Sequence, residues 1–154
     1  MTNTRTIRAE RLKSFAESVM LETGCNGTET KAVAEVLVEA DLRGIYSHGT
    51  ARLKRYVDHI ASGVIRPDTE PTLVFASKMA AVYDGRGGVG QRVGSVAMEK
   101  TLDLAAANGI GFCSVRNSNH YGIAGYYAEK AAERGFIGVS TTNTAPLVVP
   151  TYSK

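Results

Sequence analysis

Residues 80–94, AAVYDGRGGVGQRVG, decide the fold class of this chain. A short apolar run, a glycine-rich turn and the start of a helix follow one another here, in the order that dinucleotide-binding folds use. The glycine spacing is Gly-x-Gly-x-x-x-Gly, however, and the usual fingerprint also needs an acidic residue about 20 residues later. The next apolar run instead ends near Arg116 without a carboxylate. The stretch therefore predicts a tight turn with close helix packing and argues against a standard Rossmann fold.

The part of the chain before this stretch has the periodicity of α-helices. Apolar residues recur three and four positions apart in three segments, which predicts three amphipathic helices. Gly24 and Gly63 follow the first and third segments and are typical of helix ends. Thr28 and Thr50 are placed to cap the second and third helices. The three apolar faces comprise Leu12, Phe15, Ala16, Val19 and Met20, then Val33, Val36, Leu37 and Ala40, then Leu53, Tyr56, Val57, Ile60 and Ala61.

The pattern changes near Pro67 to Pro71, where we place the boundary between a helical segment, residues 1–70, and a second unit, residues 71–154. Short apolar runs in this unit predict strands, and longer segments with helical periodicity predict helices. The expected strands are residues 72–76, 80–83, 110–115 and 136–141, and the expected helices begin near residues 90 and 123. Three helices followed by β-β-α-β-α-β indicate a layered α/β unit.

Composition narrows the class of protein. Hydrophobic residues make up 44% of the chain and charged residues 21%, as in ordinary globular proteins. The net charge of +3 is small, and acidic residues are interleaved with the arginines near the start, which disfavours a nucleic-acid partner. The chain has no apolar run long enough to span a membrane and no visible signal peptide, so we expect a cytoplasmic protein without a membrane partner. The two cysteines lie far apart and lack metal-ligand spacing, so we expect no metal site.

Three histidines are the main candidates for chemistry. His48 lies in YSHGT, residues 46–50, between two expected helices, with Arg52 four residues further on. A histidine and an arginine at the start of a helix suit a carboxylate, because helix N–H groups and a guanidinium both bind anions. The alternative is a loop histidine that bonds to the backbone. His59 sits off the apolar face of its helix, which favours a solvated side chain.

His120 lies in VRNSNHYG, residues 115–122, a polar loop between an expected strand and an expected helix. Ligands in α/β folds bind past the carboxyl ends of strands, which is where this loop lies. Asn117 and Asn119 could hold the imidazole in one tautomer. Histidine titrates near neutral pH, so His120 is a candidate general acid–base. A purely structural role for this histidine is the alternative.

Three segments together resemble the malate/L-lactate dehydrogenase family. They are DLRGIYSHG, residues 41–49, with Arg52 and Tyr56 after it, then DGRGGVGQ, residues 84–91, and VRNSNHYGIAGYY, residues 115–127. Ile137-Gly138, Thr142-Asn143 and Pro146 also fit, so the resemblance runs from about residue 7 to residue 150. Ser-His-Gly followed by Asn-Ser-Asn-His, in this order and spacing, is a specific combination.

The resemblance implies both a fold and a reaction. The fold class is α/β (α+β), with an N-terminal three-helix segment followed by part of a mixed, largely antiparallel sheet with helices, and it is not a standard Rossmann fold. The reaction is reversible hydride transfer between NAD or NADP and a carbon that bears a hydroxyl or imino group next to a carboxylate. The substrate would be a small 2-hydroxy or 2-oxo acid of the malate or lactate kind, and family members are usually homodimers.

The resemblance also implies roles for individual residues. His120 matches the family's acid–base histidine, and His48 matches the Ser-His-Gly histidine that contacts substrate, so we expect both to be catalytic. The expected substrate-binding residues are Arg52, Ser47 and Asn119, and the expected cofactor-binding residues are Thr142, Asn143 and Thr144.

Family members continue well beyond the position of Pro150, whereas the sequence in hand stops at Lys154. Much of the cofactor site would then lie outside it. We therefore expect the N-terminal part of such an enzyme, from a truncated or split gene or as a fragment. The alternative is a catalytically inactive remnant that acts at most as a structural or association module, for which an open sheet edge predicts self-association.

Overall fold

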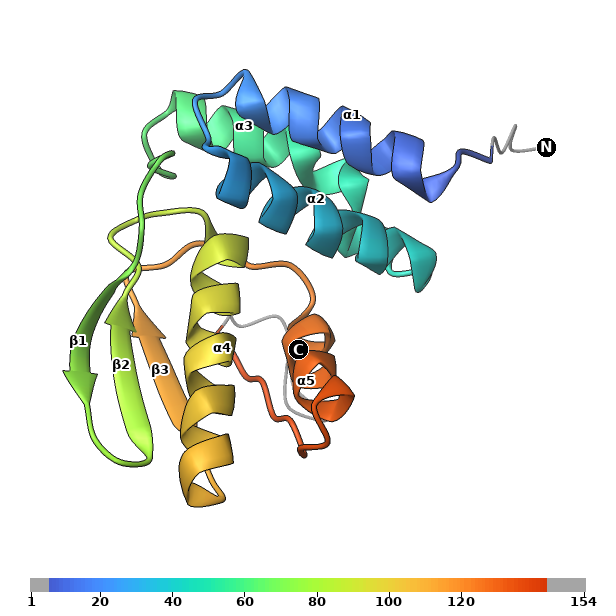
Figure 1. The fold of residues 1–154 in the computed structure, drawn as a ribbon. Coiled ribbons are helices and arrows are strands. Elements are labelled where there is room, and N and C mark those ends of the chain that lie inside the picture. Colours follow the sequence, from blue (N-terminus) through green and yellow to red (C-terminus); the bar gives the residue numbers. More distant parts are fainter. Residues whose placement is uncertain (1–5, 144–154) are drawn as a thin grey trace, which may run out of the picture.

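A computed structural model describes residues 6–143 of the chain. Within this range the chain forms five α-helices, three strands and two short 3₁₀ helices, Tyr46–His48 and Thr50–Arg52. In chain order the main elements are α1 (Ala9–Leu21), α2 (Gly27–Leu42), α3 (Leu53–Ala61), β1 (Thr72–Ala76), β2 (Ala80–Asp84), α4 (Gly90–Asn108), β3 (Phe112–Arg116) and α5 (Ala124–Glu133). Figure 1 shows α1 to α3 in an upper layer and α4 between the sheet and α5.

The sheet is mixed, as the sequence predicts. Its strand order is β1-β2-β3, with β1 and β2 antiparallel and β2 and β3 parallel. Tyr83 of β2 pairs with Leu73 on one side and with Val115 on the other. Strands β1 and β2 form a hairpin around Ser77, and α4 makes the crossover that a parallel pair requires.

Two hydrophobic clusters hold the layers together. The first joins α1, α2 and α3 through buried residues such as Met20, Leu37 and Tyr56. The second joins α2, α4 and α5, and it is made of Val36, Ala40, Met98, Leu102, Ile123, Tyr126, Tyr127 and Ala131. Helix α2 therefore packs on both sides, which fixes the helical layer against the α/β unit.

The two predicted threonine caps are wrong. Helix α2 is capped by Asn26, whose side chain accepts hydrogen bonds from the backbone N–H groups of Thr28 and Glu29, while the Glu29 carboxylate accepts from the Asn26 N–H. This reciprocal capping box begins the helix two residues earlier than a Thr28 cap would. Thr50 begins a 3₁₀ helix rather than α3, because its N–H and hydroxyl are both bonded to Asp41.

The strand predicted over residues 136–141 is also wrong, since this segment forms no strand in the described part of the chain. Its apolar side chains Ile137 and Val139 are 97% and 76% exposed. An apolar run becomes a strand only when a neighbouring strand accepts its backbone hydrogen bonds, and the described sheet ends at β3. No helix among residues 6–143 is long and apolar enough to cross a membrane.

Candidate active site

His48 is held in a tight turn after α2. The Asp41 carboxylate accepts hydrogen bonds from the Thr50 N–H at 2.9 Å and from the Thr50 hydroxyl at 2.6 Å, which closes the turn around His48. Gly49 lies so close to this carboxylate that a Cβ there would be 1.7 Å from Asp41 Oδ1. The glycine of Ser-His-Gly is therefore needed for the close approach of Asp41, which fixes the position of the imidazole.

His120 is held by the glycine-rich stretch. The Asn119 side-chain amide donates to the carbonyl oxygens of Gly87 and Gly88, both at 2.9 Å. A Cβ on Gly90 would lie 2.3 Å from the carbonyl oxygens of both Asn119 and His120, so the start of α4 touches the backbone of this loop. The Gly87 N–H in turn donates to the Asn117 carbonyl at 2.8 Å. Because these groups bond within the protein, the stretch positions the histidine loop rather than a phosphate.

The fold brings the two predicted histidines together. The imidazole rings of His48 and His120 are stacked, with centroids 5.5 Å apart and planes 25° apart. The Ser47 hydroxyl lies 3.0 Å from His48 Nδ1, so it supports that ring. Two polar loops that are far apart in the sequence thus place two proton-carrying rings side by side.

Tyr56 and Gln91 form a buried hydrogen-bond chain behind His120. Tyr56 Oη lies 2.7 Å from His120 Nδ1, and Gln91 Nε2 donates to Tyr56 Oη, also at 2.7 Å. Tyr56 is 2% exposed and Gln91 is fully buried. The sequence prediction that Asn117 and Asn119 fix the imidazole tautomer is wrong, because Asn117 bonds to Asp84 and Asn119 to the glycine stretch.

The surroundings of His120 disfavour its charged form. Burial comes first, and electrostatic repulsion from the basic groups His48, Arg52, Arg55 and His59 adds to it, so that the pKa of His120 is lowered to about 4. The pKa of Tyr56 is raised to about 12, mainly because burial disfavours the tyrosinate. Both groups are therefore neutral at pH 7, and the contact between them is a hydrogen bond between neutral groups rather than an ion pair.

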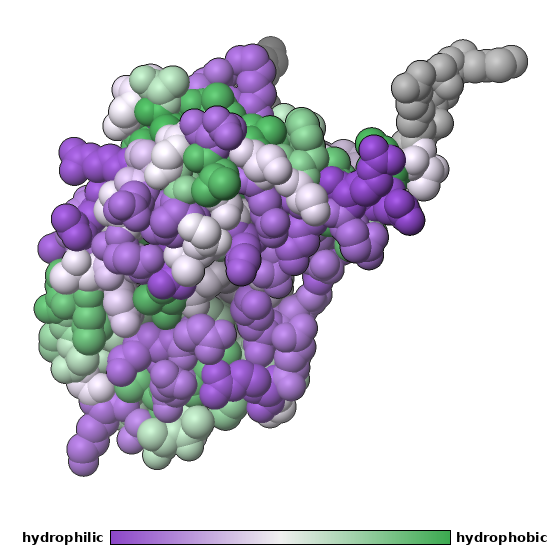
Figure 2. All heavy atoms as spheres, turned by 45° about the horizontal axis from the view of Figure 1, so that its top comes forward, coloured by the Kyte–Doolittle hydropathy of each residue, from purple (hydrophilic) through white to green (hydrophobic). Residues whose placement is uncertain are grey.

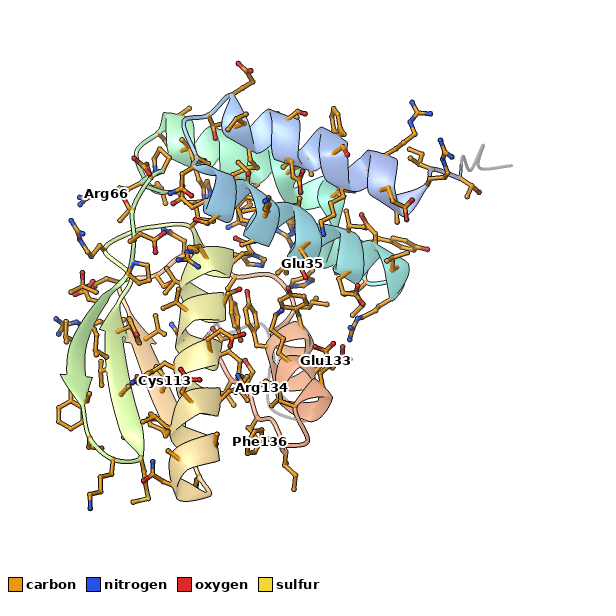
Figure 3. All side chains as sticks on the ribbon, viewed as in Figure 1. Glu35, Arg66, Cys113, Glu133, Arg134 and Phe136 are labelled. Carbon is orange, nitrogen blue, oxygen red and sulfur yellow. The ribbon has the colours of Figure 1, made fainter. Side chains whose placement is uncertain are left out.

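A large cavity of about 1380 Å³ opens beside the two histidines. Its lining comes from the His48 turn, α3, α4, β3, the His120 loop and the segment after α5. Figure 3 labels two residues of this lining, Cys113 on β3 and Phe136 after α5. Thr142 and Asn143, which the sequence predicts to bind cofactor, also line it. Thr144, the third residue of that prediction, lies outside the described residues.

Arg55 lines the cavity, and the predicted Arg52 does not. The Arg52 guanidinium donates through Nε to the Ser47 carbonyl at 2.5 Å, so Arg52 braces the His48 turn and does not line the cavity. Arg55, one helical turn along, does line it, together with a half-buried His59. The sequence reasoning missed Arg55 as a site residue and assigned His59 to solvent. The third predicted substrate-binding residue, Asn119, lines the cavity while its amide holds the glycine stretch.

Comparisons with known proteins identify a family. The family model for malate/L-lactate dehydrogenase matches residues 7–154. The chain is 50% identical over 145 residues to malate dehydrogenase of Pyrococcus abyssi, a match that covers 94% of this chain and 40% of that protein. It is 39% identical over 144 residues to L-sulfolactate dehydrogenase of Methanocaldococcus jannaschii, covering 94% of this chain and 42% of that protein.

The fold matches as well as the sequence. The solved structure of malate dehydrogenase from Pyrococcus horikoshii OT3 is similar with a TM-score of 0.85 and 44% identity, covering 88% of this chain and 39% of that one. The chain therefore spans about two fifths of the length of these relatives. Since the family model extends over almost all of the sequence, the chain belongs to the malate/L-lactate dehydrogenase family.

Proposed function

We propose that this chain forms the N-terminal, acid–base part of an oxidoreductase that transfers a hydride between a nicotinamide cofactor and a small 2-hydroxy acid. The observation that carries the proposal is the stacked pair His48 and His120 at the wall of a large cavity. Two relatives are named for malate and sulfolactate, which are both 2-hydroxy acids with a second anionic group. Cationic groups at this cavity, Arg55 above all, suit such an anion.

Each residue has a distinct task in this proposal. His120 exchanges a proton with the substrate oxygen at C2, and His48 donates a hydrogen bond to the same region. Arg55 at the cavity wall holds the substrate carboxylate, and Arg52 braces the turn that carries His48. Ser47 and Asn119 keep the two histidine loops in place.

We propose that the cavity holds a nicotinamide cofactor, either NAD or NADP. Its volume of about 1380 Å³ exceeds the roughly 300–1,000 Å³ of sites for drug-sized ligands, so a dinucleotide and a small acid can share it. Thr142 and Asn143 offer hydroxyl and amide groups at its wall, and Thr144 is proposed with them. When bound, the nicotinamide ring would supply or accept the hydride.

A turnover assay tests the proposal. The chain is mixed with NADH or NADPH and a panel of 2-oxo acids, and loss of the reduced cofactor is followed by absorbance. We expect His120→Ala and His48→Ala each to lower the rate by about 100-fold or more, as for loss of a general acid–base group. The control is Lys54→Ala, which removes an exposed side chain of α3 and should leave the rate unchanged. Unchanged turnover in His120→Ala would refute the acid–base assignment.

A second candidate function is a catalytically inactive module that acts by association. The observation that favours it is the exposed apolar surface of the sheet, where Phe75 and Phe112 are 53% and 63% exposed. Absence of turnover with every 2-oxo acid in the assay would support this candidate. A homodimer, expected from the family resemblance, and a cytoplasmic location, expected from the sequence, stay predictions for either function.

A further inference from the structure

The hydrogen-bond chain behind His120 contains one group without a partner. Gln91 Nε2 donates to Tyr56 Oη, but Gln91 Oε1 is buried and has no hydrogen-bond partner among the described residues. A buried amide oxygen without a partner costs about 1–3 kcal/mol, so its presence beside the candidate active site needs a reason. The charge state of His120 provides one.

The observed arrangement suits neutral His120. Gln91 donates to Tyr56 Oη, which leaves the Tyr56 hydroxyl proton to point at His120 Nδ1. The Gly122 N–H, 3.3 Å from Nδ1, adds a second donor to the same nitrogen. Because Nδ1 accepts twice, the ring proton must sit on Nε2. Nε2 has no partner among residues 6–143 and is the nitrogen left for a substrate.

Charged His120 needs the opposite arrangement, and so does the neutral ring when it takes a substrate proton, because Nε2 accepts a proton only if the ring proton sits on Nδ1. Both ring nitrogens of an imidazolium are donors, so Nδ1–H then requires an acceptor, and Tyr56 Oη lies 2.7 Å away. The Tyr56 hydroxyl proton must then turn toward Gln91. If the Gln91 amide turns over, its unpartnered Oε1 takes the place of Nε2 and accepts that proton.

We propose that Tyr56 and Gln91 are positioning residues that form a reversible relay, whose hydrogen bonds reverse direction when His120 passes from its resting Nε2–H form to the Nδ1–H form that proton exchange at Nε2 requires. The relay deepens the proposed function and rests on it. A glutamine suits this place because its amide has one donor end and one acceptor end of nearly equal shape. Leu or Met would fill the space but offer neither end, and Glu would offer an acceptor alone.

Nitrogen NMR on the ¹⁵N-labelled chain tests the relay without cofactor or turnover. Long-range ¹H–¹⁵N spectra show which imidazole nitrogen carries the proton. We expect the Nε2–H tautomer of His120 at pH 7, and a mixture of tautomers in Tyr56→Phe. Gln91→Glu should favour Nδ1–H and raise the pKa of His120 by about one unit or more, because the carboxylate accepts the Tyr56 proton.

Two control variants separate the relay from simple packing. Gln91→Met keeps the side-chain volume but has no carboxylate, so the relay predicts that His120 retains the Nε2–H tautomer in this variant and changes it only in Gln91→Glu. If Gln91 serves only to fill space, the Met and Glu variants should give the same tautomer. Tyr83→Phe removes a hydroxyl on β2 away from the relay and should leave His120 unchanged. The relay is overturned if His120 carries its proton on Nδ1 in the unmodified chain, or if Tyr56→Phe leaves the tautomer unchanged. Absence of turnover with the expected tautomers would count against the proposed function alone.

Discussion

At the scale of single residues, the burial of His120 makes the stability of the chain depend on pH. Its folded pKa of about 4 lies below the ordinary value of about 6.5, so the unfolded chain binds more protons between these two values. The stabilisation is complete above about pH 6.5 and is lost as the pH falls toward 4. Since the side chain is only half-buried, we expect an effect on the order of 1 kcal/mol.

Urea unfolding at pH 7 and pH 5 measures this effect. The unmodified chain should lose more unfolding free energy between these values than His120→Gln, which cannot titrate. His48, His59, Arg52 and Arg55 face the ring and stay in place in the variant, so the difference isolates His120. An equal loss in both proteins would show that His120 is not held neutral by the fold.

The sequence singled out the two histidines that the fold brings together, but not the hydrogen-bonded residues behind one of them. Tyr56 lies on the apolar face of its predicted helix, so periodicity assigned it to the core, and it is buried there. A buried tyrosine hydroxyl still needs a hydrogen-bond partner, and that need was the available signal. Gln91 gave no comparable signal, because its contact with Tyr56 depends on how α4 packs against α3, which no local pattern specifies.

At the scale of elements, one carboxylate joins α2 to the connection that leads to β1. Glu29 is fully buried, and its oxygens accept from the backbone N–H groups of Asn26, Asp68 and Thr69 at 3.0, 2.8 and 3.2 Å. Glu29→Gln keeps the shape but turns an –NH₂ group toward these donors. We expect a loss of about 1–3 kcal/mol in unfolding free energy, measured by urea denaturation.

The matched control is Glu22→Gln at the exposed C-cap of α1, where no hydrogen bond of this kind is lost. This change should leave stability within about 0.5 kcal/mol, as for ordinary surface substitutions. Equal effects of the two variants would mean that the Glu29 network does not stabilise the junction.

Elements were predictable where their pattern is local, and less so where it depends on neighbours. Helical periodicity was sufficient for the α-helices among residues 6–143, and short apolar runs were sufficient for β1 and β2. Residues 136–141 have a similar apolar pattern but no neighbouring strand to pair with in the described structure. Capping was misassigned because Asn26 and Thr28 are both good caps, and the choice depends on Glu29 and its tertiary contacts.

At the scale of the whole molecule, one side of the sheet is apolar and exposed. All five residues of β1 are exposed, and Phe75 and Phe112 are more than half exposed. Figure 2 shows an apolar area at the left of the molecule, where β1 lies in Figure 1. Strands β1 and β3 are the two edges of the described sheet, and edges with apolar side chains pair readily with other chains.

We therefore expect the 154-residue chain to self-associate through its sheet. Sedimentation velocity should show species larger than a monomer whose share rises with protein concentration. Because lysine on an edge strand opposes pairing, Phe75→Lys together with Phe112→Lys should shift the chain toward monomer. Phe15→Lys is the matched control, since Phe15 is 59% exposed on α1, away from the sheet. A monomer at every concentration, or equal dispersal by Phe15→Lys, would contradict association through the sheet and would weaken the case for the inactive association module.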